Sequence, residues 1–277
     1  MGLFDGHAYV RSLLPTLAER VSSLPTRPIA AVVMLGDDMT PFVRQKEQLA
    51  EKLGVGFEKH IFPESITTRE FRTHLNDIVR LRRVSGVVVQ LPLPPHINPA
   101  VLNVIPPAKD PDFLSDRAVG MYFNGRSTIE PPTPAAIMAA ISESEVELAN
   151  SIVALFGYGT LVGRFLVHEL LSRRALVRIV AHEVSEKLFN GTVAGANIVI
   201  SAVGQAHFIS ASKLPINAII IDAGFSLGVD GKVHGDIDFA GVQGEFPFVS
   251  SVPGGIGPVG VAMLYRNIVE LHAKYHP

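Results

Sequence analysis

Short apolar runs alternate with helical repeats of hydrophobic residues along the first third of the chain. The runs 29–35 and 87–89 are apolar without alternation, which is typical of strands buried on both faces of a sheet. Hydrophobic residues recur at helical spacing over 9–22, 41–53 and 67–81, and a further short strand is predicted over 55–61. Thr67 or Thr68 opens the third helix, with Glu70 as its capping-box partner. This alternation of strands and helices predicts a parallel sheet.

The second half of the chain repeats this alternation after a long irregular stretch. Residues 96–134 are rich in proline and aspartate and are expected to be irregular, and a helix over 135–142 leads into the second domain. Strands are predicted over 151–156, 176–181, 198–202 and 218–221, with a helix over 164–172 and a final amphipathic helix over 259–274. We therefore expect a two-domain α/β fold: an N-terminal α/β domain over 1–134, completed by the C-terminal helix 259–277, and a Rossmann-like parallel-sheet domain over 135–258.

Composition excludes several classes of protein. The 277 residues are 47% hydrophobic and 18% charged, with a formal net charge of −2 and no block of Lys and Arg, so we expect neither a nucleic acid nor a membrane as partner. The chain has no cysteine, which excludes disulfides and thiolate metal sites and fits a reducing compartment. The histidines show no metal-binding spacing, so no metal site is predicted. With neither a signal peptide nor a membrane-length apolar run, we expect a cytoplasmic protein.

Gln90 stands where the strand 87–89 must end. Pro92 and Pro94 lack N–H groups and cannot continue the ladder, so the chain leaves the sheet there. Open α/β sheets hold ligands at the carboxyl ends of their strands, which favours a Gln90 side chain that points into a cleft. The alternative is that Gln90 only caps the strand. Asp112, in the irregular stretch, is equally open to two interpretations: a ligand contact or a solvated turn aspartate.

The stretch 151–181 has the strand, glycine turn, helix and strand of a dinucleotide site. Gly157 permits the tight turn, Gly159 lets the backbone approach a pyrophosphate, and Gly163 lets the helix pack on the strand. Glu183 follows the second strand, where a carboxylate can accept a hydrogen bond from a ribose 2′-hydroxyl and would repel a 2′-phosphate. The alternative for Glu183 is a surface glutamate, and for the adjacent His182 a strand-end histidine. The two later strands also end at glycines, Gly204 and Gly224, where backbone can lie close to a flat ligand.

Three motifs together resemble the bifunctional methylenetetrahydrofolate dehydrogenase/cyclohydrolase family. They are Val-Gln-Leu-Pro-Leu-Pro at 89–94, Lys-Asp-Pro-Asp at 109–112 and Pro-Gly-Gly-Ile-Gly-Pro at 253–258, and the likeness covers nearly the whole chain. The resemblance implies oxidation of 5,10-methylenetetrahydrofolate with NAD(P), followed by hydrolysis of the methenyl product, in one-carbon metabolism. It also implies that folate lies in a cleft between the domains, that NAD(P) lies on the second domain, and that the protein is a homodimer formed through the second domains.

The resemblance also assigns roles to residues. The family's catalytic lysine corresponds to Lys46; Gln90 is expected to contact it, and Asp112 to hold the pterin. A partly desolvated lysine loses its charge more easily and can move protons. Further folate contacts are expected from Phe42, Leu91, Pro92, Pro253, Gly254 and Gly255. The cofactor contacts are expected from Gly157, Tyr158, Gly159, Val162, Gly163, His182, Glu183, Val203, Gly204 and Gly224.

The chain also departs from the family pattern. Phe42 replaces a tyrosine near the lysine, and Phe113 replaces a glycine after Lys-Asp-x-Asp. Tyr158 and Gly159 replace an Arg and a Ser that would hold a 2′-phosphate, which together with Glu183 favours NAD over NADP. The alternatives are a dehydrogenase without cyclohydrolase activity, a folate- or nucleotide-binding protein without turnover, and a Rossmann dehydrogenase that acts on amino acids.

Overall fold

The computed structural model describes residues 2–36, 41–181, 183–228, 232–240 and 246–276. Contacts divide the chain into two compact units. The first, which we call the N-terminal unit, comprises Arg11–Pro132 and Val261–Pro277. The second, the central unit, comprises Thr133–Gly260 and Met1–Val10.

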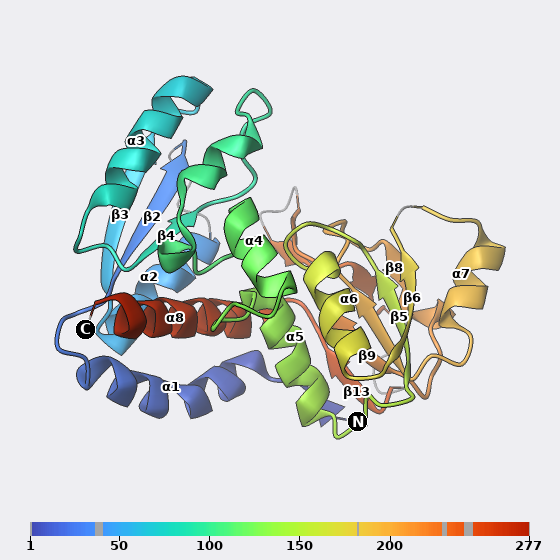
Figure 1. Ribbon diagram of the computed structural model, residues 1–277. Coiled ribbons are helices and arrows are strands. Elements are labelled where there is room, and N and C mark those ends of the chain that lie inside the picture. The colour runs from blue at the N-terminus through green and yellow to red at the C-terminus, as the bar shows by residue number, and fades with distance from the viewer. Residues whose placement is uncertain (1, 37–40, 182, 229–231, 241–245, 277) are drawn as a thin grey trace. The chain divides into compact units, whose positions relative to one another are not determined.

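The N-terminal unit is built on a three-stranded parallel sheet (Figure 1). Its order is β3 (Gly56–Phe62), β2 (Ile29–Leu35) and β4 (Gly86–Val89), so the central strand is β2. All of β4 is buried, as its unbroken apolar sequence predicts. Helices α1 (Gly6–Ser22), α2 (Pro41–Leu53) and α3 (Thr68–Arg80) alternate with the strands along the chain, and α3 packs Phe71 and Leu75 into the core beside β2 and β4.

The start of α3 confirms the capping box. Thr67 is the N-cap, and its hydroxyl accepts from the Glu70 backbone N–H at 3.2 Å. The Glu70 carboxylate accepts in turn from the Thr67 N–H at 3.0 Å. Two of the N–H groups that a helix start leaves unpaired are thereby satisfied.

The C-terminal helix α8 (Ile256–Tyr275) packs on the N-terminal unit, as predicted. An ion pair of 3.6 Å joins Arg20 of α1 to Glu270 of α8. Deeper in, His272 is 2% exposed, and its ring nitrogens lie 2.8 Å from the Ser85 hydroxyl and 3.0 Å from the Thr26 hydroxyl. Burial lowers the pKa of His272, and the neutral ring therefore ties the end of α8 to the segments that precede β2 and β4.

The expectation that 96–134 is irregular was wrong. The stretch contains the 3₁₀ helices Pro99–Val104 and Pro107–Lys109 and the α-helix α4 (Asp116–Phe123), and α5 (Pro132–Glu143) begins within it. Ser115 caps α4 by accepting from the Ala118 N–H. The helix is short and buries only Ala118 and Tyr122, so its hydrophobic repeat is too brief to recognise by period.

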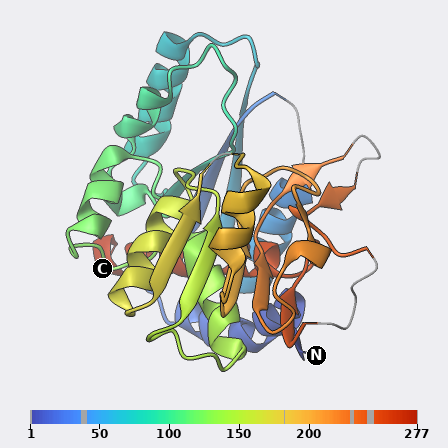
Figure 2. The same ribbon diagram turned by 90° about the vertical axis from the view of Figure 1, so that its right-hand side faces the viewer.

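The central unit contains a six-stranded parallel sheet (Figure 2). Its order is β1 (Gly2–Leu3), β13 (Phe248–Ser250), β9 (Ile219–Asp222), β7 (Ile198–Ser201), β5 (Ile152–Phe156) and β6 (Leu176–Val180). Helices α6 (Gly163–Ser172) and α7 (Glu186–Val193) follow β5 and β6 in the chain. Further two-residue strands among the described residues of this unit are Ile209–Ser210, Ser226–Leu227, Val233–His234 and Ile237–Asp238.

The first ten residues belong to the central unit, whereas the sequence placed them in the N-terminal domain. The reason is that β1 pairs with β13, with Gly2 opposite Phe248 and Leu3 opposite Val249. A two-residue strand carries no periodic signal, so the sequence could not reveal this pairing.

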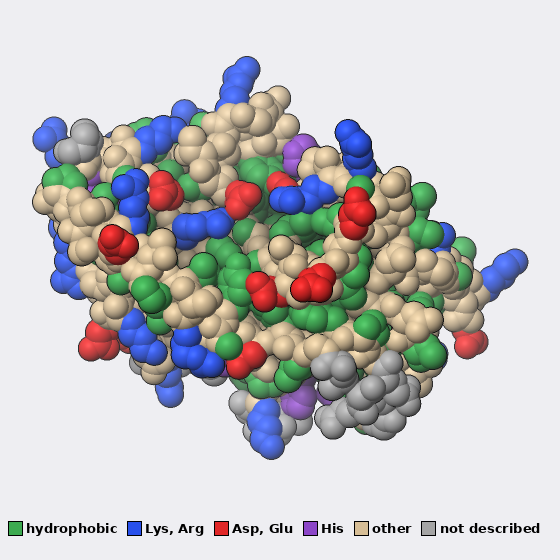
Figure 3. Space-filling model, turned by 90° about the horizontal axis from the view of Figure 1, so that it is seen from below, with side chains coloured by type: hydrophobic (Ala, Val, Ile, Leu, Met, Phe, Trp, Pro, Cys, Tyr) green, Lys and Arg blue, Asp and Glu red, His purple; other side chains and the backbone are tan. Residues whose placement is uncertain are grey.

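The distribution of charged and hydrophobic side chains does not change this description of the fold. Figure 3 shows acidic and basic side chains interspersed on one face of the molecule, among hydrophobic ones. In the part of the chain that the structure describes, we find no helix that combines the length and apolar character needed to span a membrane.

Candidate functional site

Lys46 and Gln90 meet in the N-terminal unit, where the amine of Lys46 donates to the Gln90 side-chain oxygen at 3.0 Å. Lys46 comes from the second turn of α2 and is only 8% exposed. Gln90 follows β4, and its backbone N–H still donates to Val33 of β2 at 2.9 Å. Its side-chain amide donates to the Leu91 carbonyl at 3.1 Å, which leaves the amide oxygen directed at Lys46.

Asp112 supplies a carboxylate whose charge acts on Lys46. Desolvation lowers the pKa of Lys46, and the negative charge of Asp112 partly opposes this effect. Desolvation likewise raises the pKa of Asp112 to about 6, against the attraction of Lys46. Near neutral pH the carboxylate form of Asp112 therefore predominates, beside an amine that gives up its proton more easily than an exposed lysine does.

Asp110 builds the turn that presents Asp112. It is fully buried and accepts from the Leu114 N–H at 2.9 Å, from the Ser115 N–H at 2.8 Å and from the Ser115 hydroxyl at 2.6 Å. Burial is the largest influence on its pKa, which is raised. In the sequence Asp110 stood out only as part of a motif, and the structure shows that it organises the loop.

The two phenylalanines that depart from the family pattern lie close to these residues in the chain. Phe42 is half-buried on α2, one turn before Lys46. Phe113 has a φ of +56°, the left-handed conformation that glycine adopts at lower cost. Its ring is 3% exposed and packs edge-on against Tyr122 at 5.6 Å, so it is buried within the N-terminal unit.

The predicted folate contacts fall into both units. Leu91 and Pro92 leave β4 through a cis peptide bond, with Leu91 half-buried and Pro92 exposed. Pro253, Gly254 and Gly255 lie in the central unit. A Cβ on Gly255 would overlap the Ser250 hydroxyl oxygen, so close packing already accounts for this glycine. The sequence predicted that the final helix starts at residue 259, but α8 begins at Ile256 and includes the last three residues of the motif 253–258.

The three glycines of the turn before α6 differ in how closely other atoms pack against them. Gly157 has a φ of +99°, and a Cβ there would overlap the Ala202 carbonyl oxygen. A Cβ on Gly163 would overlap the Gly157 carbonyl oxygen. Gly159 is exposed, and a Cβ there would meet no atom within 4 Å beyond its chain neighbours. Of these three glycines, only Gly159 therefore leaves space that a ligand could use.

The first turn of α6 has no side-chain cap. Val162 is the N-cap residue, and its side chain makes no capping hydrogen bond. The positive end of the helix dipole at this turn suits a phosphate. Tyr158 is exposed at the turn, and Glu183 is exposed three residues after β6. His182 lies outside the described residues.

Two buried aspartates, which the sequence analysis did not single out, hold the ends of β7 and β9. Asp236 accepts from the Ser201 hydroxyl at 2.7 Å and from the backbone N–H groups of Val203 and Gly204 at 2.6 and 3.0 Å. Asp222 accepts from the Gly224 N–H at 2.9 Å, and burial raises the pKa of Asp222 to about 6.

These aspartates change the interpretation of the predicted cofactor glycines. The N–H groups of Val203 and Gly204 are already bonded to Asp236, so they are not free donors to a ligand. Gly224 is buried, and a Cβ there would overlap an Asp236 carboxylate oxygen. Packing against Asp236 explains this glycine without a ligand.

Family models cover most of the chain. The model described as "Tetrahydrofolate dehydrogenase/cyclohydrolase, catalytic domain" matches residues 4–112, and the model described as "Tetrahydrofolate dehydrogenase/cyclohydrolase, NAD(P)-binding domain" matches residues 131–276. The chain belongs to the tetrahydrofolate dehydrogenase/cyclohydrolase family. This confirms the predicted family and excludes a Rossmann dehydrogenase of another family.

Individual relatives agree with this family assignment. The bifunctional protein FolD of Bacillus subtilis is 33% identical over 274 residues, which cover 97% of this chain and 96% of the relative. FolD 2 of Geobacter sulfurreducens is 34% identical over 274 residues, which cover 97% of this chain and 95% of the relative. The solved structure of bifunctional FolD from Campylobacter jejuni superposes with a TM-score of 0.90 at 28% identity and covers 100% of both chains. The predicted two-domain α/β fold is confirmed, and both activities in the family's name are supported.

The packing of the glycine turn predicts opposite results for two matched substitutions. Gly163→Ala should lower the free energy of unfolding by about 1–3 kcal/mol, because its methyl group overlaps the Gly157 carbonyl. Gly159→Ala should change it by less than about 0.5 kcal/mol. If the turn binds NAD(P), Gly159→Ala should nevertheless weaken binding about tenfold. Chemical denaturation and cofactor titration measure both effects, and equal stability of the two variants would contradict the packing account.

Proposed function

We propose that Lys46 moves the protons of the cyclohydrolase reaction. Hydrolysis adds water to the bridging carbon of the methenyl cation. Both protons of the water leave as the formyl carbonyl forms: one is delivered to the ring nitrogen whose bond to that carbon breaks, and one is released to solvent. The observation that supports this role is the buried amine of Lys46, 3.0 Å from the neutral Gln90 oxygen and with a lowered pKa. An amine of this kind can accept and return a proton near neutral pH more readily than an exposed lysine can.

Gln90 and Asp112 have complementary roles in this proposal. Gln90 orients the amine through a hydrogen bond that does not fix its charge, since an amide oxygen can accept from either protonation state. Asp112 accepts two hydrogen bonds from the amino-pyrimidine edge of the pterin. The dehydrogenase step requires the folate methylene and the nicotinamide ring to be held close and parallel, so positioning supplies most of its catalysis.

Substitution of Lys46 separates proton transfer from binding. Lys46→Ala should reduce hydrolysis of methenyltetrahydrofolate by about 10²–10⁴, the usual contribution of a general acid–base. Folate affinity should stay within about tenfold, because uniform binding and proton transfer are separable. Lys52→Ala, at an exposed lysine on the same helix, is the matched control and should match the unsubstituted protein. Hydrolysis that survives in Lys46→Ala would show that this role is wrong.

We propose NAD as the preferred cofactor, within the NAD(P) binding that the family model supports. Tyr158 and Gly159 offer no cation for a 2′-phosphate, and the exposed Glu183 would repel one. A related structure from Trypanosoma brucei, 27% identical with a TM-score of 0.90, is a complex with NADP and inhibitor. The preference for NAD or NADP therefore depends on the side chains at Tyr158, Gly159 and Glu183 and not on the fold.

The cofactor proposal predicts a higher kcat/KM with NAD than with NADP. Glu183→Gln should raise kcat/KM for NADP about tenfold, since removal of one like charge is worth about 1.4 kcal/mol at short range. Glu186→Gln, at an exposed glutamate in the first turn of α7, is the control and should leave the ratio unchanged. A strong preference for NADP, unaffected by Glu183→Gln, would overturn the proposal.

We further propose that the protein forms a homodimer through the central unit and acts in the cytoplasm. The strand β6 supports the first point: it lies at an edge of the sheet, pairs only with β5 among the described strands, and exposes Leu176 and Ile179. A bare edge of this kind is usually covered in a stable protein. The absence of cysteine fits the second point.

Sedimentation equilibrium tests the dimer. The expected mass is about twice the 29.8 kDa of one chain. Ile179→Lys should shift the mass toward that of one chain, because it places a charge on the exposed edge. Leu227→Lys, at another exposed leucine in the central unit, should not. A protein that sediments as one chain at micromolar concentration would contradict this proposal.

A further inference from the structure

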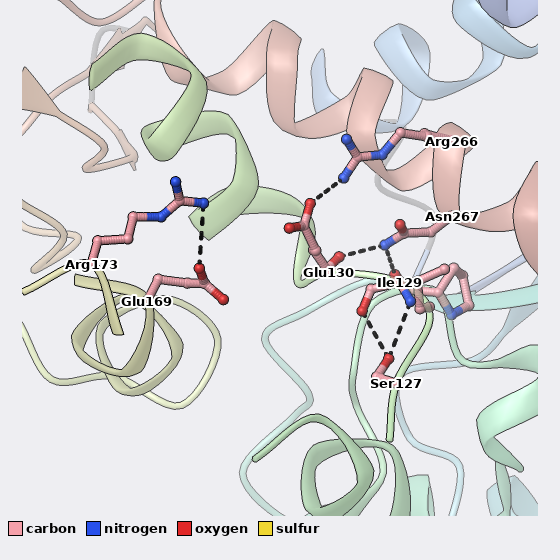
Figure 4. Close-up of polar contacts among 8 residues, drawn as sticks. Ser127, Ile129, Glu130, Glu169, Arg173, Arg266 and Asn267 are labelled. Atoms are coloured by element: carbon pink, nitrogen blue, oxygen red, sulfur yellow. Dashed lines mark hydrogen bonds and ion pairs between the residues drawn. The ribbon is translucent and has the colours of Figure 1, made fainter. Parts of the chain in front are cut away.

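Three consecutive residues of α8 make very different contacts within the N-terminal unit. Tyr265 and Asn267 are each 1% exposed, whereas Arg266 is half-exposed and pairs with the exposed Glu130 carboxylate at 2.8 Å. Figure 4 shows Arg266 and Asn267 extending from the same helix toward Glu130, the first to its side chain and the second to its backbone. The two buried residues direct their hydrogen bonds to backbone carbonyls.

Asn267 holds the backbone next to Asp112. Its amide nitrogen donates to the Pro111 carbonyl at 2.9 Å and to the Glu130 carbonyl at 2.7 Å. Both N–H groups of the side chain are therefore used. They link the Pro111 and Glu130 carbonyls, which flank the segment 112–129. A buried amide with two such bonds restricts the loop, because loss of the amide would leave the Pro111 carbonyl of a buried hydrogen bond without its partner.

Tyr265 holds the backbone of Lys46 in the same way. Its hydroxyl donates to the Lys46 carbonyl oxygen at 2.7 Å. Burial raises the pKa of Tyr265, so the hydroxyl remains a donor throughout the physiological range. The bond fixes the position of α2 relative to α8 at Lys46, the residue whose amine donates to Gln90.

The packing of α8 also reaches the strand that carries Gln90. A Cβ on Gly86, the first residue of β4, would lie 2.9 Å from Ile268 and 3.2 Å from the Pro111 ring. Helix α8 thus contacts the segments of Lys46, Gln90 and Asp112 through three neighbouring residues, Tyr265, Asn267 and Ile268.

We propose that Tyr265 and Asn267 are positioning residues that set the separation of Lys46 from Asp112. The proposal rests on the proposed function, in which Lys46 moves protons and Asp112 holds the pterin. Asn267 acts on folate binding through the Pro111 carbonyl, and Tyr265 acts on proton transfer through the Lys46 carbonyl. Catalytic groups tolerate displacements of only about 0.5 Å, so the loss of either bond is felt at the site.

Kinetics of Asn267→Leu, Tyr265→Phe and Arg266→Gln test this proposal. Asn267→Leu should raise KM for methylenetetrahydrofolate about tenfold and leave KM for NAD(P) within about twofold. Tyr265→Phe should lower kcat for hydrolysis about tenfold, displace its pH profile and leave the folate KM within about threefold. Arg266→Gln, which removes only the exposed ion pair, should match the unsubstituted protein. A purely structural defect, which would overturn the proposal, would lower the active fraction and reduce kcat without changing either KM or the pH profile.

Asp112→Asn and Lys46→Ala, measured in the same assay, separate the two proposals. If Asp112→Asn loses folate binding and Lys46→Ala loses hydrolysis while Asn267→Leu and Tyr265→Phe behave as Arg266→Gln does, the positioning role is wrong and the proposed function stands. If Asp112→Asn and Lys46→Ala are unimpaired, the proposed function itself fails. Asn267→Leu removes both donors of a buried amide and can prevent folding. Tyr265→Phe, which keeps the ring, then still tests whether contacts from α8 position the site: an unchanged kcat and pH profile for hydrolysis would overturn the proposal.

Discussion

The removal of the Lys46 amine from water is the constraint on which the N-terminal unit depends. A buried ammonium is costly unless it is paired, and the chain offers it a neutral amide at 3.0 Å and the charge of Asp112. Desolvation lowers the pKa of Lys46, and the charge of Asp112 opposes this effect. Desolvation also raises the pKa of Asp112 to about 6. Burial therefore favours the uncharged form of both groups, compared with an exposed lysine or aspartate. The fold therefore has to hold the two groups at a fixed separation.

The surrounding elements meet this requirement with backbone contacts. The ladder between β2 and β4 extends to the Gln90 N–H, and the buried Asp110 organises the loop of Asp112. The C-terminal helix completes the unit from the far end of the chain. In the central unit a similar arrangement uses Asp236 and Asp222 to hold the ends of β7 and β9. In both units, buried carboxylates order loops by accepting hydrogen bonds from backbone N–H groups.

Local signals in the sequence predicted most of the regular structure. The apolar run of β4, the capping box at Thr67 and the glycine turn before α6 each depend on neighbouring residues, and each appears as expected. Features that depend on distant residues were missed. The pairing of β1 with β13 has no local pattern, and no local pattern distinguishes Asn267 from the other polar residues of α8. The motifs supplied Lys46, Gln90 and Asp112, but only the structure shows that Asp236 already occupies the N–H groups of Val203 and Gly204.

Direct titration of the Lys46 amine tests the central claim of this account. Nuclear magnetic resonance of protein labelled at its lysine side chains, with the Lys46 signal assigned by its loss in Lys46→Ala, gives the pKa in the unliganded protein. The account predicts a value below the ordinary lysine value of about 10.4, and a further decrease in Asp112→Asn, because the Asp112 carboxylate opposes the effect of burial. A pKa at or above the ordinary value would contradict the account.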